Sequence, residues 1–167
     1  MKRPVSGLMR RLTLSHLVAQ WARSTRGRLA FSTPPTAAEI FSMAQSLGRV
    51  IDDLLIEERS PADIRSIGAD LAQELGEYWQ QTLEFLDIAL TAWPQMLDAL
   101  NLSDAAALRG ERIDRQALAA PHLYGERPVI AAGSTGSIPA TARLLAAIAG
   151  LPRGALVLPG LDMAMQP

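Results

Sequence analysis

Two short apolar runs near the C-terminal end of this 167-residue sequence limit its possible folds more than any other feature. The first, Pro-Val-Ile-Ala-Ala (residues 128–132), leads into the turn Gly-Ser-Thr-Gly-Ser, and the second is Ala-Leu-Val-Leu (residues 155–158). Ser137 can cap a helix between them that ends at Gly150. The pattern predicts a buried strand, a helix and a second buried strand parallel to the first. Because parallel strands need cover on both faces and further strands beside them, we expect one piece of a larger sheet.

The preceding part of the chain shows helical periodicity. Helices are expected over residues 6–24, 36–58, a short stretch from 60, 71–100 and 103–121. The second helix opens with a capping box formed by Thr36 and Glu39. Pro94 is expected to kink or divide the fourth, in which Trp93 is a core residue, and Pro121 is expected to end the fifth.

These patterns predict an α/β chain that is mostly helical. A helical subdomain of four to five helices is expected over residues 1–125, followed by a strand-helix-strand piece over residues 126–167. No apolar stretch approaches the ~20 residues that a membrane helix needs, so we expect no membrane partner and a cytoplasmic location.

The charge is unevenly distributed although the formal net charge is only −1. Residues 1–38 contain seven basic residues and no acidic one, whereas residues 39–98 contain twelve acidic residues and three arginines. Such a basic segment is typical of a nucleic-acid-binding arm, an organelle transit peptide, or a helix packed on an acidic neighbour.

The nucleic-acid interpretation and the packing interpretation use nearly the same arginines. Phosphate contacts need little beyond cations on one face, which makes Arg10, Arg11, Arg23 and Arg26 the candidate DNA-binding residues. In the packing interpretation, Arg10, Arg11 and Arg23 pair with the acidic helices that follow. Both interpretations stay open at the level of the sequence.

The Gly-rich turn after the first strand is the second candidate site. Its residues Gly133, Ser134, Thr135 and Gly136 carry backbone amides that can cradle an anion. The turn is not a P-loop, because no Lys stands beside a Ser or Thr at its end, and Pro139 occupies the third glycine position of a dinucleotide fingerprint. We expect a structural turn, with cofactor binding by a nucleotide-binding, reductase-like fragment as the alternative.

Other catalytic or metal sites have little support. The sequence has no cysteine, and His16 and His122 have no partner at metal-ligand spacing. The adjacent acids at residues 52–53 and 57–58 diverge by about 100° on a helix and indicate a solvated face. We therefore expect no metal, no cofactor and no catalytic residue.

Several stretches of the chain resemble one family of DNA-repair proteins. They are residues 4–12, 17–21, 77–88, 92–94, 128–141 and 156–162. The most specific of them contains the sequence GSTGSIPAT (residues 133–141). In these stretches the chain closely resembles AddB, the double-strand-break repair subunit of the alphaproteobacterial AddAB helicase-nucleases, and the resemblance covers nearly the whole chain.

The resemblance implies an internal slice of a longer protein that has a helicase-like N-terminal half and a C-terminal nuclease domain. With AddA, that protein resects broken DNA ends for homologous recombination. The slice would hold a helical subdomain and a strand, helix and strand of a RecA-like domain, while the nucleotide-binding segment would precede Met1. Residues 129–132 lie where an active helicase places magnesium-binding acids, yet they are apolar.

The implied function is therefore a non-catalytic scaffold segment, not an enzyme by itself, whose partners are an AddA-like subunit and DNA. Two other functions stay open: the small nucleotide-binding fragment, which would use residues 133–139, and a helical protein-interaction module without nucleic-acid contact. The isolated chain is expected to expose its apolar strands, and so to be marginally stable or to self-associate.

Overall fold

The computed structural model describes residues 2–24, 27–28, 30–31, 33–60, 62–64, 66 and 81–160. They form a mostly helical structure with two parallel sheets of two strands each. The chain divides into two compact units, Met1–Ala106 and Ala107–Pro167. The sequence-based division at residue 125 placed helix α6 (Ala105–Tyr124) in the helical part, whereas the boundary between the two units falls near the start of α6. No described helix is long and apolar enough to span a membrane.

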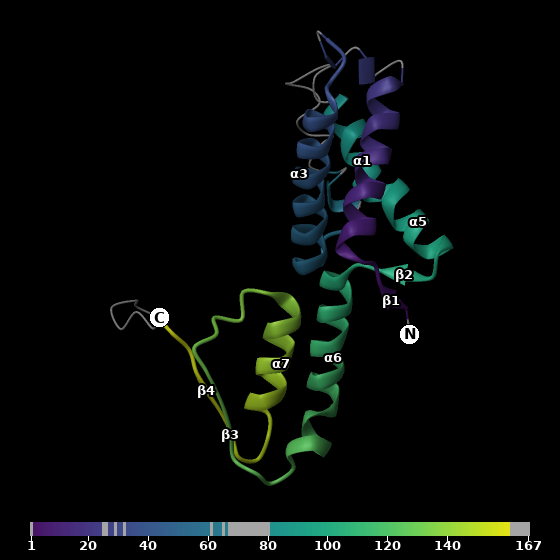
Figure 1. Ribbon diagram of the computed structural model, residues 1–167. Coiled ribbons are helices and arrows are strands. Elements are labelled where there is room, and N and C mark those ends of the chain that lie inside the picture. Colours follow the sequence, from purple (N-terminus) through teal and green to yellow (C-terminus); the bar gives the residue numbers. More distant parts are fainter. Residues whose placement is uncertain are drawn as a thin grey trace. The chain divides into compact units, whose positions relative to one another are not determined.

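Helices α1 (Gly7–Arg23) and α3 (Ala37–Ile56) pack against each other in the first unit (Figure 1). Each begins after a residue whose side chain accepts a hydrogen bond from an amide in the first turn. Ser6 Oγ accepts from the amide three residues later at 3.2 Å. The predicted capping box of α3 is confirmed, because Glu39 N donates to Thr36 Oγ1 at 3.3 Å and Thr36 N donates to Glu39 Oε2 at 2.7 Å.

The long apolar run is interrupted at Pro94, as predicted. An α-helix widens into a single π-helical turn, η1 (Ile88–Ala92), before α5 (Trp93–Ala99) begins. The first amide of α5 donates to the carbonyl five residues back. Because Pro94 lacks an N–H and its ring clashes with the carbonyl four residues earlier, a wider turn relieves the clash. Residues 71–80 of the run, like the end of the short helix predicted after Ser60, lie outside the described residues.

The core of the first unit is built from α1, α3, η1 and α5. Leu14 and Val18 of α1, Leu47 of α3 and Trp93 of α5 are each 2% exposed or less. Burying a side chain of this size contributes roughly 1.5–3 kcal/mol to folding. The prediction that Trp93 is a core residue is confirmed.

A parallel strand pair joins the N-terminus to the segment after α5. Strand β1 (Arg3–Pro4) pairs with β2 (Leu102–Ser103), and Val5 N donates to Ser103 O at 2.9 Å. Beside this pair, the ammonium of Lys2 pairs with the carboxylate of Asp98. Strands of two residues carry no recognisable alternation, so no sequence pattern predicts them.

The second unit contains the predicted strand-helix-strand. Strand β3 (Val129–Ala132) runs parallel to β4 (Gly154–Val157), and α7 (Pro139–Ala149) lies between them in sequence (Figure 1). Helix α7 packs against both strands. The α/β class with mostly helical content is thus confirmed, while a RecA-like fold remains a prediction.

Two predicted helix ends in this unit are wrong. Helix α6 does not stop by Pro121 but continues to Tyr124, and the carbonyl of Pro121 accepts a hydrogen bond from Gly125 N at 3.0 Å. Ser137 is not the cap of α7. The residue before the helix is Ile138, and Pro139, whose φ is fixed near the helical value, occupies the first helical position.

Each C-terminal strand is half-buried on one face and exposed on the other, whereas the sequence predicted full burial. The register places Ile130 opposite Ala155 and Ala132 opposite Val157, and all four side chains are exposed. Ile130 is 69% exposed and Val157 is 57% exposed. The other face is the one that α7 contacts. The described chain therefore exposes apolar strand residues, as expected, while self-association remains a prediction.

Candidate functional site

Arg10, the first of the predicted DNA-binding residues, is bound within the protein. Its Nη1 donates to Asp52 Oδ2 at 3.0 Å, and its Nη2 donates to Asp52 Oδ1 and to the Gly48 carbonyl, each at 2.9 Å. Its Nε lies 2.9 Å from Asp104 Oδ1, at an angle outside that of a hydrogen bond, so this contact is an attraction between charges. The side chain of Arg10 is 19% exposed. Arg10 therefore ties α1 to α3 and to the residue before α6.

Asp104 is the buried end of this network. Only 3% of the residue is exposed, and its Oδ2 accepts a hydrogen bond from Trp93 Nε1 at 2.7 Å. Burial raises the pKa of Asp104, although the Trp93 hydrogen bond and the charge of Arg10 act in the opposite direction. A buried carboxylate of this kind is stable only with its donors in place.

Arg11 and Arg23, the next two predicted DNA-binding residues, are exposed on α1. Within the described part of the chain, neither of them forms an ion pair, and the same holds for the exposed Arg28. Arg26 lies outside the described residues. The described arginines of this set therefore differ, because Arg10 binds carboxylates while Arg11 and Arg23 face solvent.

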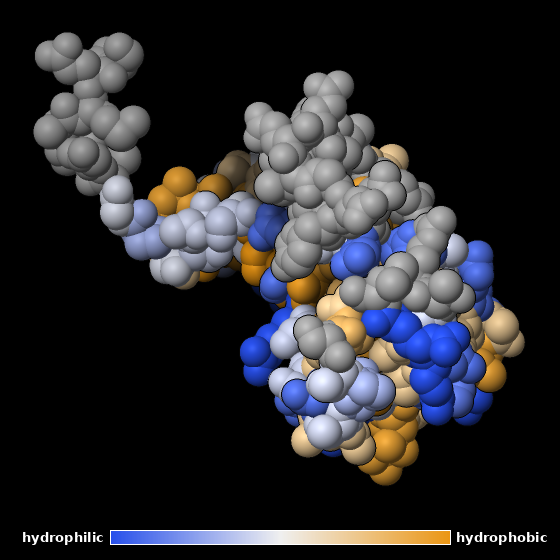
Figure 2. All heavy atoms as spheres, turned by 90° about the horizontal axis from the view of Figure 1, so that it is seen from above, coloured by the Kyte–Doolittle hydropathy of each residue, from blue (hydrophilic) through white to orange (hydrophobic). Residues whose placement is uncertain are grey.

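Arg23 and Arg28 line a hollow of about 740 Å³ where α1 ends and α3 begins. Other residues of its wall are Ala19, Ala22, Phe31, Thr33, Pro34, Pro35 and Ile40. Figure 2 looks down on this end of the first unit and shows strongly hydrophilic side chains at the surface beside hydrophobic ones. The hollow therefore combines two cations with an apolar floor.

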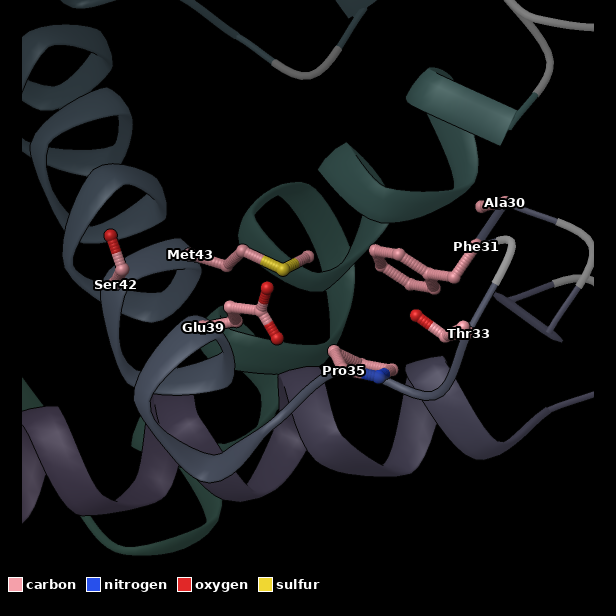
Figure 3. A pocket seen from close by; sticks show the side chains of 7 residues that line it. All are labelled: Ala30, Phe31, Thr33, Pro35, Glu39, Ser42 and Met43. Atoms are coloured by element: carbon pink, nitrogen blue, oxygen red, sulfur yellow. The ribbon is translucent and has the colours of Figure 1, made fainter.

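A second hollow of about 400 Å³ lies beside the first and shares Phe31, Thr33 and Pro35 with it. Figure 3 shows Phe31 and Met43 pointing toward one another in this hollow. Glu39 is its charged residue, and hydrogen bonds from the backbone and side chain of Thr36 hold the pKa of Glu39 below its ordinary value. Phe31 therefore borders one hollow that contains two arginines and another that contains a carboxylate.

The turn after α1 places Arg28 close to Arg23. Gly27 N donates to Ser24 Oγ at 3.1 Å, and Arg28 N donates to Ser24 O at 3.0 Å. A Cβ on Gly27 would lie 2.0 Å from the carbonyl oxygen of Trp21, so only glycine permits this close return of the chain. Trp21 also meets Phe31 edge to face, with ring centroids 5.8 Å apart.

The Gly-rich turn after β3 is formed as a strand-to-helix connection. Gly133 and Gly136 have φ of +80° and +69°, which glycine adopts without strain. The amide of Gly136 faces Ser134 Oγ at 3.4 Å, and Thr135 Oγ1 lies 3.3 Å from the next serine hydroxyl. These polar groups therefore interact partly with one another within the turn.

Neither the helix start nor the nearest cation favours an anion at this turn. Pro139, the first residue of α7, has no amide to donate. Arg143, the next cation, binds Asp114 of α6 through contacts of 2.7 and 3.0 Å. These contacts lower the pKa of Asp114. Gly133, Ser134, Thr135 and Gly136 lie together as predicted, but the groups that would hold a phosphate are missing or paired.

The remaining candidate groups do not form a metal or acid-base centre. His16 and His122 are exposed, and the described residues contain no cluster of three potential metal ligands. Of the adjacent acids at residues 52–53, the first binds Arg10 and the second is exposed. Both acids at residues 57–58 are exposed.

Sequence reasoning missed two features of this region. The Arg10 and Asp104 contact joins residues far apart in sequence, and Asp104 resembles an ordinary helix-capping residue. The hollow at Arg23 and Arg28 includes Phe31, which lies in a segment without periodicity. The sequence signal for the hollow was that no acidic residue precedes Glu39.

The chain was compared with protein-family models, with curated proteins and with solved structures, and none of them matches.

Proposed function

We propose that this chain is a non-catalytic scaffold segment of an AddB-like subunit, which supports DNA end processing in double-strand-break repair in the cytoplasm. Its second unit would belong to a RecA-like sheet of the parent protein. Its partners would be an AddA-like helicase-nuclease subunit and DNA. The proposal combines the sequence resemblance with one structural observation, the unpartnered sheet of the second unit.

That observation is the exposed apolar face of β3 and β4. Four apolar side chains lie together on it in register, and the two-stranded sheet has no further described strand at either edge. A parallel sheet is stable when helices cover both faces and other strands continue it. The face is therefore what a strand-helix-strand piece of a larger α/β domain would present.

The end of β3 supports a scaffold role rather than a catalytic one. Ala131 and Ala132 end the strand, and Gly133 follows, so no carboxylate stands at the position where a helicase would hold magnesium. The turn after it has Pro139 at the start of α7. These residues give little support to the nucleotide-binding alternative.

The DNA contact in this proposal rests on Arg11 and Arg23, because Arg10 is bound to Asp52 and Asp104. Exposed arginines on one helix suit phosphate contacts, which dominate non-specific affinity for DNA. The Arg10 contact is also the observation that favours the second candidate, a helical interaction module in which arginines serve packing only. Salt dependence separates the two, since phosphate binding weakens steeply with added salt.

The test is fluorescence anisotropy of the chain with a labelled duplex that carries a single-stranded tail, at low and at moderate salt. Replacing Arg11 and Arg23 by Gln should weaken binding, whereas replacing the exposed Arg109 and Arg112 of α6 by Gln is the matched control. Absence of binding at low salt would contradict the DNA-contact part of the proposal.

A separate test is needed for the proposal that the chain belongs to an AddB-like subunit, because DNA binding alone does not identify that subunit. The chain should co-elute in size-exclusion chromatography with an AddA-like subunit bound to the remainder of an AddB-like protein. Ile130→Lys, which places a charge on the exposed sheet face, should reduce co-elution. Failure of the unaltered chain to co-elute would count against the scaffold role.

A further inference from the structure

We propose that the hollow at Arg23 and Arg28 binds the single-stranded part of a DNA end, with a phosphate at the two arginines and a base against Phe31. The inference rests on the proposed DNA-repair function and names the form of DNA that this surface takes. It concerns the first unit alone, since all the residues that line the hollow belong to α1, α3 and the segment between them.

The cationic part of the hollow is set by the backbone. Arg23 is in the last turn of α1, and the turn through Gly27 returns the chain so that Arg28 lines the same hollow. Neither arginine pairs with an acid in the described part of the chain. Two unpaired guanidinium groups beside one cavity suit a phosphate diester, which accepts hydrogen bonds from both.

The apolar part of the hollow favours a single strand over a duplex. Phe31, Pro35 and Ile40 line it, and its volume of about 740 Å³ is within the ~300–1,000 Å³ range of pockets that bury small ligands. An unpaired base can lie against an aromatic ring, whereas a duplex keeps its bases stacked and paired. Phe31 is half-buried and its ring meets Trp21 in a T-shaped contact, so the ring is held in place before a base arrives.

Glu39 disfavours a phosphate in the adjoining hollow. The residue lines that hollow, which shares Phe31 with the first, and Thr36 N and Oγ1 donate to its carboxylate at 2.7 and 2.8 Å. These bonds keep the carboxylate ionised, and a phosphate there would meet a like charge. The phosphate is therefore expected at Arg23 and Arg28, in the hollow without the carboxylate, with the base against Phe31.

The experiment compares a labelled oligothymidine with a blunt duplex of equal length, using the full chain at several salt concentrations. The chain should bind oligothymidine more tightly than the duplex. R23Q/R28Q should reduce the slope of log affinity against log salt by about 0.7, the value for one lost phosphate contact on a single strand. The control R109Q/R112Q, with the same charge change on α6, should leave the slope unchanged.

Phe31→Leu keeps apolar bulk but removes the aromatic face, and it should weaken oligothymidine binding about fivefold or more. Phe41→Leu, at a ring that is 40% exposed on α3 and lines neither hollow, is the control. If Phe31→Leu lowers the helical circular-dichroism signal of the chain, the salt slope of R23Q/R28Q decides instead.

The outcomes separate this inference from the function on which it rests. A chain that binds oligothymidine and duplex equally, or a correctly folded Phe31→Leu variant that binds as well as the unaltered chain, overturns the single-strand site and leaves DNA binding intact. A chain that binds neither DNA at low salt overturns the proposed DNA contact itself. An unchanged salt slope in R23Q/R28Q shows that the phosphates lie elsewhere.

Discussion

Removing the guanidinium of Arg10 is expected to destabilise the first unit far more than neutralising Asp104. Arg10→Met leaves the carboxylate of Asp104, 3% exposed, without its cation, and leaves the Gly48 carbonyl without that donor. Removing one partner of a buried ion pair typically costs about 3–5 kcal/mol. We expect a loss in that range for the unfolding free energy of Arg10→Met.

Asp104→Asn should cost only about 1 kcal/mol, the net value of an ordinary hydrogen bond. The amide oxygen of Asn can still accept from Trp93 Nε1, and Arg10 keeps its bonds to Asp52 and to the Gly48 carbonyl. The double variant R10M/D104N should regain much of the stability lost in Arg10→Met, because no uncompensated buried charge remains.

The pH dependence follows from the raised pKa of Asp104, whose largest cause is burial. The folded state binds this proton more readily than the unfolded state, so the stabilisation from protonation is fully present below the ordinary pKa. It is lost as pH rises through the raised pKa. Asp104→Asn lacks this dependence, and its stability relative to the unaltered chain should therefore increase as pH rises through that interval.

Urea denaturation followed by tryptophan fluorescence measures these changes. All three tryptophans, at positions 21, 79 and 93, lie in the first unit, so the signal reports on that unit. An uncompensated buried charge at Asp104 is ruled out if Arg10→Met and Asp104→Asn lower the unfolding free energy equally, or if the double variant is no more stable than Arg10→Met.

Four further changes test the local packing and capping. Gly154→Ala should unfold the second unit at a lower temperature by circular dichroism, because its Cβ would lie 1.8 Å from the Ile148 carbonyl; Gly110→Ala, in open space within α6, should instead stabilise by about 0.5–1 kcal/mol. Ile130→Lys should reduce apolar-dye binding and self-association in light scattering without lowering the melting temperature, since the side chain is 69% exposed. Thr36→Ala should cost about 1 kcal/mol in urea denaturation through the lost cap of α3, and an unchanged midpoint would contradict that role.

Only part of the candidate site could be predicted from the sequence. The acid-free N-terminal segment identified the arginines, because net charge over a segment is readable without a fold. Which of them face solvent depends on neighbours distant in sequence: Asp52 and Asp104 bind Arg10, while Arg23 meets Arg28 across a turn that needs Gly27. Periodicity alone cannot distinguish an arginine that binds its own protein from one that is exposed.

The sequence by itself determined the features that arise from contacts between near neighbours. Thr36 and Glu39 fix the start of α3, Pro94 interrupts the long run, and the strand, helix and strand of the second unit follow from local patterns and turn residues. Each of these signals acts within about one helical turn or one strand, so it needs no knowledge of the remaining chain.

Only the tertiary structure decided which elements contact one another and which side chains are buried. The two-residue strands β1 and β2 pair, and α6 continues beyond Pro121. Ile130 is exposed, although its strand was predicted to be buried. An apolar strand has the same sequence whether its second face is covered or not, and a carboxylate such as Asp104 has the same sequence signal whether it caps a helix or is buried against an arginine. Burial depends on elements brought together from a distance, and that is the physical reason why these features could not be predicted.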